Sequence, residues 1–329
     1  MTTSVCMGIY NGEEYIEAQL DSILRQTKEP EEVILCDDGS TDQTVSIVQS
    51  FIKKNLLHDK WHLFCNKQNK GYPGNYYYAM SLCRQEVVFL ADQDDVWEDT
   101  KIERMCAVLE QHSEAKVVCC KFGLIDAGGK KIHTFMSPTH SKNTGELQAV
   151  DIERVFYKCE WPGMVLAYRR KWYEQWSRQI TVTQYKDEYV KSTKKRCPDI
   201  PHDFLVCARA AEEGRFLQMD EELAWHRRHD RNTGKEEYHV RRLLNKQRKL
   251  EEIRNYLRVL DAFEKESVLL TKEGRIKLYQ KQESMRRRYE ALQSGKISRV
   301  IANAVNQKER VRLVTVVCDM LIVRSKKLR

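Results

Sequence analysis

The sequence is poor in the features that mark membrane-spanning and secreted proteins. No run approaches the roughly 18 apolar residues that a membrane-spanning helix requires. The first residues, MTTSVCMGIYNG, contain neither a basic segment nor a long apolar core, so we expect no signal peptide. The 11 cysteines include no C-x-x-C pair, and an odd count does not suit a complete disulfide framework. A reducing compartment fits better, and we predict a cytoplasmic protein.

Charge, proline and glycine are unevenly distributed along the 329 residues. Residues 235–329 carry 25 Lys and Arg against 12 Asp and Glu, whereas residues 1–234 carry 31 against 36. Proline is absent from the basic segment, and glycine is rare there. We therefore expect two parts, a folded domain over 1–234 and a basic helical extension over 235–329.

Short β-rich apolar runs alternate with amphipathic segments over the first 130 residues. Strands are expected at 4–10, 31–39, 61–66, 86–95 and 116–126, and helices at 13–26, 41–54, 74–83 and 97–111. This alternation predicts a mainly parallel sheet with helices on both faces. Further along, residues 164–168 resemble a buried strand, a helix opens near His202, and residues 216–225 resemble an apolar connection.

Three of the expected strands end in residues suited to a ligand site. Asp37 and Asp38 follow VILC, Asp92 and Asp94 follow VVFLA, and Tyr10 ends the first strand. Carboxyl ends of parallel strands meet at one edge of the sheet, where ligands bind. Solvated turn residues explain any one of these clusters but poorly explain all three. Since Mg²⁺ or Mn²⁺ takes one or two carboxylates plus substrate phosphates, we interpret the edge as a site for a cation that carries a diphosphate.

Several stretches occur in a recognisable order over about residues 3–234. They are IYNGEEYIEAQLDSILRQT, VILCDDGSTDQT, NKGYPGN, VVFLADQDDVW, GMVLAYRR, IPHDFLVCARAAEEGRFLQMDEELAWHRRH and DRNTG. Together they resemble the inverting family-two glycosyltransferases, and DQDDVW with the later HD is most similar to the bacterial rhamnosyltransferase-like branch that builds surface polysaccharides. The resemblance implies a GT-A fold, a Rossmann-like mixed α/β sheet with helices on both faces, here followed by the helical extension. It also implies a UDP- or dTDP-sugar donor, Mn²⁺ or Mg²⁺, and a glycan or lipid-linked oligosaccharide acceptor.

The resemblance carries nucleotide and metal roles to five residues. It places Tyr10 beside the nucleobase, Asp38 on the base and Asp92 near the ribose. Asp94 matches the metal-binding acid, and His229 sits where the family often supplies a histidine to the metal or diphosphate. His226 stands where the family commonly has an aromatic residue.

The resemblance assigns the catalytic base to Asp203 in the HD pair. A carboxylate there would take the proton of the acceptor hydroxyl, and attack opposite the leaving group would invert the anomeric centre. The alternative is an acid favoured only by the helix dipole. Glu160 and Trp161 are candidates to line the sugar and acceptor sites, with a packed loop as the alternative. We expect His202 to orient Asp203.

Other functions remain as alternatives. A Mg²⁺-dependent phosphatase or phosphotransferase requires a nucleophilic Asp at the end of the first strand, and SVCMGIYNG has none. A nucleic-acid-binding protein could use the basic extension, but no recognition module is present, so we expect no nucleic-acid partner. A non-catalytic nucleotide-sugar-binding relative is disfavoured by the presence of Asp94 and Asp203.

The last 19 residues, VRLVTVVCDMLIVRSKKLR, join an apolar stripe to basic flanks. The residues that share one helical face are Leu313, Val316, Val317, Met320 and Leu321. Such a helix can lie in a membrane interface without spanning it. We expect it to hold a cytoplasmic enzyme at the anionic inner face of the cell membrane. Packing on the catalytic domain, or pairing with another subunit in a homo-oligomer, is the alternative.

Overall fold

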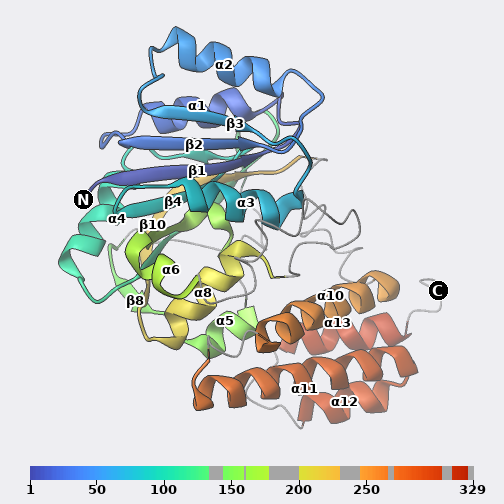
Figure 1. The fold of residues 1–329 in the computed structure, drawn as a ribbon. Coiled ribbons are helices and arrows are strands. Elements are labelled where there is room, and N and C mark those ends of the chain that lie inside the picture. The colour runs from blue at the N-terminus through green and yellow to red at the C-terminus, as the bar shows by residue number, and fades with distance from the viewer. Residues whose placement is uncertain are drawn as a thin grey trace. The chain divides into compact units, whose positions relative to one another are not determined.

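The computed structural model describes residues 1–132, 144–158, 161–177, 200–229, 245–265, 270–305 and 313–324. The chain divides into two units, which are described separately. The first comprises residues 1–151 and 159–229, and the second comprises residues 152–158 and 230–329. In Figure 1 the second unit is the orange and red helices together with the green helix α5 (Ile152–Lys158).

A mixed sheet forms the centre of the first unit. Its strands are β1 (Thr3–Ile9), β2 (Glu32–Asp37), β3 (Trp61–Cys65), β4 (Val87–Asp92), β5 (Val96–Trp97), β6 (Val117–Ile125), β7 (Lys131–Ile132), β8 (Leu147–Ala149), β9 (Leu166–Arg169) and β10 (Phe216–Arg227). The order is β3-β2-β1-β4-β9-β6-β10-β5, with β7 paired to β6 and β8 to β10. Strands β3, β2, β1 and β4 are parallel, as the sequence predicts. Strand β9 runs antiparallel between β4 and β6 and makes the sheet mixed.

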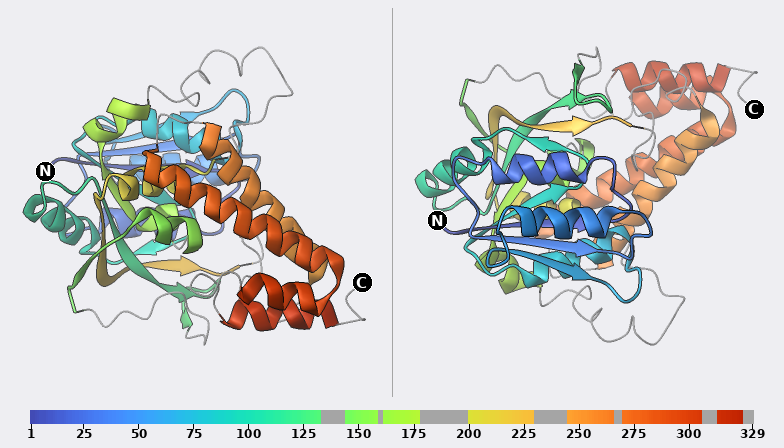
Figure 2. Two further views of the ribbon diagram at one scale, coloured as in Figure 1. Left: turned by 90° about the horizontal axis from the view of Figure 1, so that it is seen from below. Right: turned by 90° about the horizontal axis from the view of Figure 1, so that it is seen from above.

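Helices cover the sheet and bury its central strands. They are α1 (Ile16–Leu24), α2 (Thr44–Lys54), α3 (Gly71–Leu82), α4 (Lys101–Gln111), α6 (Arg170–Ser177) and α8 (His202–Glu212), with a short 3₁₀ turn η1 (Gly163–Val165) before β9. Helix α3 packs on β1 and β2, and α4 packs on β6. Figure 2 shows α1 and α2 side by side. Val5, Leu35 and Phe89 are completely buried, as near-continuous apolar strands covered on both faces require.

The parallel register brings three strand ends to one edge of the sheet. Ile9 of β1 lies opposite Asp37 of β2, and Gly8 lies opposite Asp92 of β4. The residues that follow these strands therefore leave the sheet together, as the sequence predicts.

Strand β10 is a correction to the sequence-based expectation of an apolar connection over 216–225. It is a 12-residue strand that runs parallel to β6, with register shifts between Gln218 and Ala224. Asp220, in the acidic middle of the strand, is buried, forms an ion pair with Lys121 of β6 and accepts a 2.7 Å hydrogen bond from the Thr144 hydroxyl. The acidic run interrupts the alternation that identifies a strand, and the irregular register accommodates it.

The second unit is helical. It consists of α5, α10 (Lys246–Lys265), α11 (Lys272–Ser294), α12 (Ile297–Val305) and α13 (Leu313–Arg324). A buried cluster joins α10, α11 and α13 through Ile253, Met285, Leu292 and Ile322. Thr271 caps the start of α11, and Gly295, with φ +66°, ends it. Among the described helices, none is long and apolar enough to cross a membrane.

Helix α13 packs through a different side from the predicted stripe. Ile322 is 1% exposed and lies in the core, whereas Val317 and Leu321 are 46% and 48% exposed. Asp319 shares the inward side and accepts two hydrogen bonds, of 2.7 and 2.9 Å, from the Arg288 guanidinium of α11. Residues 311–312 and 325–329, and the Leu313 side chain, lie outside the described part.

We predict that Arg288→Ala lowers the stability of the helical unit by about 3 kcal/mol, because it leaves the Asp319 carboxylate buried without its cation. Hydrogen exchange of the α11 and α13 amides, followed by mass spectrometry, measures the change. Arg287→Ala is the matched control, since that side chain is 57% exposed and its ion pair with Glu283 is worth about 0.5 kcal/mol or less. Equal effects of the two changes would contradict a structural role for the Arg288 ion pair.

Candidate functional site

Asp92 ends β4 and is held by an aromatic residue from α3. The Tyr76 hydroxyl hydrogen-bonds its carboxylate and lies 2.8 Å from the Ala91 carbonyl oxygen. Burial, helped by the neighbouring Asp95 and Asp94 carboxylates, raises the pKa of Asp92 to about 7. A carboxyl group with this pKa is about half protonated at pH 7.

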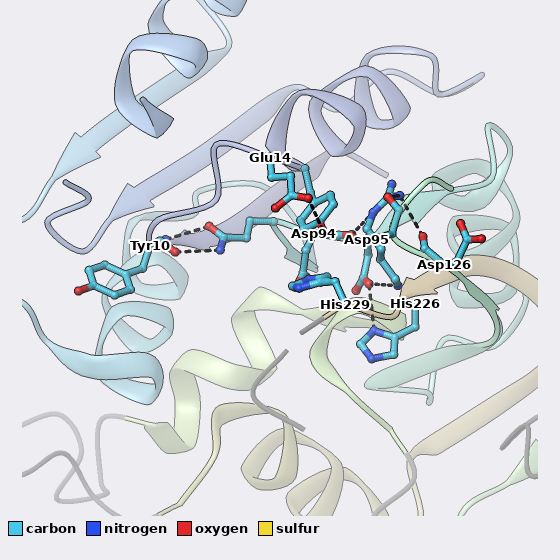
Figure 3. Close-up of polar contacts among 11 residues, drawn as sticks. Tyr10, Glu14, Asp94, Asp95, Asp126, His226 and His229 are labelled. Atoms are coloured by element: carbon cyan, nitrogen blue, oxygen red, sulfur yellow. Dashed lines mark hydrogen bonds and ion pairs between the residues drawn. The ribbon is translucent and has the colours of Figure 1, made fainter. Parts of the chain in front are cut away.

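Asp94 and His229 form a close pair across the edge. The His229 Nε2 atom lies 2.9 Å from Asp94 Oδ2, and the imidazole packs 4.4 Å from the Tyr15 ring. Arg227 also donates a 2.8 Å hydrogen bond to the Asp94 backbone carbonyl. Figure 3 shows Asp94 and His229 facing each other from two segments far apart in the sequence. The two residues assigned to a metal from the sequence are therefore adjacent.

Asp95 is completely buried and is held by the end of β10. One carboxylate oxygen accepts 2.9 Å hydrogen bonds from the His226 ring and from the Arg227 backbone N–H. The other oxygen has no hydrogen-bond partner among the described residues. Burial opposes a charge on His226, but the Asp95 and Asp94 carboxylates outweigh it and raise the pKa of His226 to about 9. His226 is therefore a cation at neutral pH that neutralises the buried acid.

The backbone of Tyr10 is fixed by Gln93, which lies between Asp92 and Asp94. Its backbone N–H and carbonyl both form 2.9 Å hydrogen bonds with the Gln93 side-chain amide. Its ring is half exposed and points away from the Asp94–His229 pair in Figure 3. An exposed ring on a pinned backbone is suited to stacking against a planar ligand.

Asp38 is buried, and residues of a loop hydrogen-bond its carboxylate. Its carboxylate accepts hydrogen bonds of 2.9 Å from the Asn66 amide and of 2.7 and 2.9 Å from the backbone N–H groups of Lys70 and Gly71. In this structure the carboxylate orders the loop between β3 and α3. Direct contact of Asp38 with a nucleobase stays a prediction.

Asp203 opens α8 and lies against the turn η1. The Phe204 backbone N–H donates a 2.7 Å hydrogen bond to its carboxylate, and the Gly163 backbone N–H also bonds it. Burial outweighs these hydrogen bonds and raises the pKa of Asp203 to about 6. The carboxylate is therefore ionised at neutral pH and is a stronger base than an ordinary Asp.

A buried lysine fixes the turn η1 from the other side. The Lys101 ammonium hydrogen-bonds the Met164 carbonyl and lies 3.6 Å from the centre of the Trp97 ring. Burial lowers the pKa of Lys101 to about 8. Because Met164 follows Gly163, this contact helps to hold the N–H group that Asp203 uses.

His202 links Asp203 by packing to the acidic turn formed by Asp92, Asp94 and Asp95. Its fully buried ring stacks on Tyr76 with centroids 3.9 Å apart and planes at 6°. Neither ring nitrogen has a hydrogen-bond partner among the described residues, and burial lowers the pKa of His202 to about 3. His202 is therefore neutral, and it positions the start of α8 by its shape, without a hydrogen bond to Asp203.

The Trp161 side chain is packed in the interior. It is 6% exposed, its indole nitrogen lies 3.4 Å from the Gln218 amide oxygen, and its ring meets Phe216 edge-on at 5.3 Å. This burial favours the packed-loop alternative for Trp161. Glu160 lies outside the described residues.

Sequence reasoning missed four residues that build this site: Tyr76, Gln93, Asp95 and Gly163. Gln93 and Asp95 lie within the DQDD stretch, and Gly163 lies within WPGM, so the motifs contained them without assigning roles. Tyr76 follows the NKGYPGN stretch directly, yet only the placement of α3 on β1 shows that it reaches Asp92.

The Asp94–His229 pair fits a divalent cation as a partial ligand set. Within the described residues no group of three or more His, Cys, Asp and Glu side chains is arranged to hold a metal. Mg²⁺ and Mn²⁺ are commonly bound through one or two protein ligands, with substrate phosphates and water completing the shell. A carboxylate beside an imidazole at the carboxyl edge of the sheet suits such a shared cation.

The sequence model of glycosyl transferase family 2 matches residues 4–211, which include the whole acidic turn and Asp203. The chain belongs to glycosyltransferase family 2. This confirms the family that the sequence motifs predicted. The rhamnosyltransferase-like branch stays a prediction.

Curated relatives match part of the length of this chain. The putative glycosyltransferase EpsE of Bacillus subtilis is 35% identical over 115 residues, which are 35% of this chain and 41% of that protein. The Escherichia coli UDP-Glc:alpha-D-GlcNAc-diphosphoundecaprenol beta-1,3-glucosyltransferase WfaP is 33% identical over 109 residues, which are 32% of this chain and 41% of that protein. The chain thus matches less than half of the length of these relatives.

Solved structures match the chain over most of its length. S. aureus TarS 1–349 in complex with UDP-GlcNAc has a TM-score of 0.53 and 17% identity, covering 95% of this chain and 93% of that one. The mannosyltransferase PcManGT from Pyrobaculum calidifontis, in complex with GDP-Man and Mn²⁺, has a TM-score of 0.50 and 16% identity, covering 98% and 85%. At this identity the likeness concerns the fold, and it confirms the predicted GT-A fold.

We predict that Asp94→Ala weakens metal-dependent binding of UDP or dTDP by at least about tenfold, because the carboxylate is a proposed ligand of the bridging cation. Calorimetry with Mn²⁺, and again with a chelator, measures the change. Asp126→Ala is the control, since its carboxylate bonds only a local turn N–H of Lys130 among the contacts seen here. Unchanged metal-dependent affinity in Asp94→Ala would refute the metal role.

We predict that Gly163→Ala lowers kcat by at least about tenfold while nucleotide affinity changes little. A Cβ atom at this position would lie 2.9 Å from the His202 Nε2 atom, and that ring is wedged against Tyr76. The turn must shift and move the N–H group from Asp203, and if Asp203 is the general base that the sequence predicts, a small misplacement is costly. In the control Gly128→Ala, the nearest atom to the new Cβ is 3.4 Å away. Equal kcat in both variants would contradict the positioning argument.

Proposed function

We propose that this protein is an inverting, metal-dependent glycosyltransferase of bacterial surface polysaccharide synthesis. It moves a sugar from a UDP- or dTDP-sugar to a hydroxyl group of a glycan or lipid-linked acceptor. The observation that carries the proposal is that packed side chains connect Asp203, the proposed base, to the aspartates at the end of β4. Asp203 follows His202, His202 stacks on Tyr76, and Tyr76 bonds Asp92 two residues before Asp94.

Asp203 supplies the base in this mechanism. Its carboxylate keeps a pKa of about 6, so it is ionised at pH 7 and accepts the proton of an acceptor hydroxyl as that oxygen attacks the anomeric carbon. The bond between the anomeric carbon and the diphosphate oxygen breaks in the same displacement, which inverts the configuration. No second carboxylate is needed as a nucleophile, so one base is sufficient.

The donor is held at the carboxyl edge of β1, β2 and β4. The Tyr10 ring stacks on the nucleobase, and Asp38 orders the loop beside it. Asp92 accepts a hydrogen bond from a ribose hydroxyl. Asp94 and His229 would hold the Mn²⁺ or Mg²⁺, which would neutralise the charge of the diphosphate. The His226 cation, paired with Asp95, keeps the buried acids at this edge from repelling the donor phosphates.

The names of related proteins support the donor and acceptor classes. WfaP is described as using UDP-Glc and a GlcNAc-diphosphoundecaprenol acceptor, and the TarS structures contain UDP or UDP-GlcNAc. These names favour a uridine nucleotide and a lipid-linked glycan for this chain, and the deoxythymidine alternative rests on the sequence resemblance. Residues 1–234 are proposed to hold the whole transferase site, and the basic segment that follows is proposed to act outside it.

A screen of nucleotide sugars with Mn²⁺ or Mg²⁺, read by release of the nucleoside diphosphate, tests the proposal. We expect release from a UDP- or dTDP-sugar, and product of inverted anomeric configuration once an acceptor is supplied. Asp203→Asn should lower transfer by about 10²- to 10⁴-fold, the usual contribution of a general base, and leave donor affinity nearly intact.

The pH dependence of transfer tests whether Asp203 acts in its unprotonated form. A base must be unprotonated, so kcat at saturating donor should fall about tenfold per pH unit below pH 6. Saturating donor keeps the titration of Asp92, whose pKa is about 7, out of this comparison. A wild-type rate in Asp203→Asn would show that Asp203 only begins a helix. Absence of metal-dependent release from both UDP- and dTDP-sugars, including release from a GDP-sugar alone, would overturn the proposed donor class.

A further inference from the structure

Helices α12 and α13 each expose an apolar pair one turn apart. On α12 the pair is Ile301 and Val305, which are 43% and 54% exposed. On α13 it is Val317 and Leu321, at 46% and 48%. Residues four apart lie on the same side of a helix. Each of these two contacting helices therefore carries an aliphatic stripe on its outer side.

The stripes remain after the helices have packed. Val300 of α12 is 4% exposed and Ile322 of α13 is 1% exposed, so each helix already has a buried contact side. The exposed part of these aliphatic side chains adds nothing to folding through burial. Exposed aliphatic groups that recur on adjacent helices indicate a surface that something else covers.

The same segment is strongly basic. Residues 296–329 contain nine Lys and Arg and only two acids, Glu309 and Asp319. Asp319 is buried and bound by Arg288, so its charge is already neutralised. Lys296, Arg299 and Arg324 are exposed, and Arg324 stands three residues after Leu321 and seven after Val317. At this helical spacing a cation extends the α13 stripe.

We propose that α12 and α13 form an interfacial face that docks this protein on an anionic lipid surface. The aliphatic pairs enter the boundary between headgroups and acyl chains, while the exposed cations meet anionic headgroups. The proposal does not depend on the transferase chemistry. It extends the sequence-based expectation from the last helix to two helices, and on α13 it narrows the predicted stripe to Val317 and Leu321, with Arg324 beside them.

The composition of the face favours lipid over protein. A second copy of the chain would bring an identical basic face, and a twofold contact would place like charges opposite each other. Protein interfaces are enriched in aromatic anchors, whereas the four exposed side chains here are aliphatic. A bilayer accepts aliphatic side chains without a complementary shape, and each nearby cation strengthens binding about fivefold, which corresponds to about 1 kcal/mol.

Co-sedimentation of the full-length protein with vesicles tests the proposal. One set of vesicles contains phosphatidylcholine alone, and the other also contains phosphatidylglycerol. We expect binding to the anionic set that weakens as salt rises. Val317→Ser with Leu321→Ser should weaken it about tenfold, and Arg299→Gln with Arg324→Gln should weaken it by a similar factor or more.

The matched control changes exposed apolar residues on a neighbouring helix. Ile276→Ser with Tyr279→Ser alters α11 side chains that are 51% and 59% exposed, and binding should stay within about twofold of the wild type. Ile301→Ser with Val305→Ser repeats the test on α12, so a folding defect in one variant leaves the other decisive. Circular dichroism identifies such a defect.

Three results would overturn the proposal. The first is no binding to anionic vesicles, and the second is an equal loss of binding in the α11 control. The third is light scattering that shows a dimer, if Val317→Ser with Leu321→Ser converts it to monomers and leaves vesicle binding unchanged. Release of nucleoside diphosphate from the donor, measured without vesicles, is the separate readout of the proposed function. Loss of that activity alone leaves the docking face standing.

Discussion

The crowding of Asp92, Asp94 and Asp95 at the end of β4 is the constraint on which the site depends. Three carboxylates this close repel one another unless each has its own partner. Asp92 is paired with a tyrosine hydroxyl, Asp94 with the His229 imidazole, and Asp95 with the His226 cation. The tyrosine comes from α3, His226 lies in β10, and His229 lies two residues after β10. The positions of α3 and β10 in the fold are therefore also requirements of the acidic turn.

Tyr76 has two functions at once. Its hydroxyl bonds Asp92, and its ring supports the buried His202 that precedes Asp203. A displacement of α3 would thus disturb both Asp92 at the end of β4 and the start of α8, where Asp203 lies. Because the stack involves buried rings on two helices, it can hold the two halves of the site in fixed relation more firmly than loops could.

How far the sequence predicts this structure depends on whether a pattern is local. The strand ends at Tyr10, Asp38 and Asp92 could be predicted, because apolar runs followed by acids identify strands and parallel pairing places their ends together. Strand β10 could not, since its acidic middle is stabilised by Lys121, a partner about 100 positions away in the chain. The burial of Trp161 and the outward side of α13 likewise depend on neighbours that periodicity does not specify.

The separation of charge between the two parts of the chain has a physical rationale. Both proposed ligands are anionic, yet the transferase part carries more acids than bases and the extension carries about twice as many bases as acids. An acidic edge can hold a diphosphate only through a bound cation, which makes donor binding dependent on metal and tied to one place. A lipid surface has many equivalent charges and needs no fixed geometry, so Lys and Arg side chains can meet it directly. In the proposed function, acids at the site would give selectivity for a metal-bridged nucleotide, and bases on the extension would give attachment to a lipid surface without competing for that nucleotide.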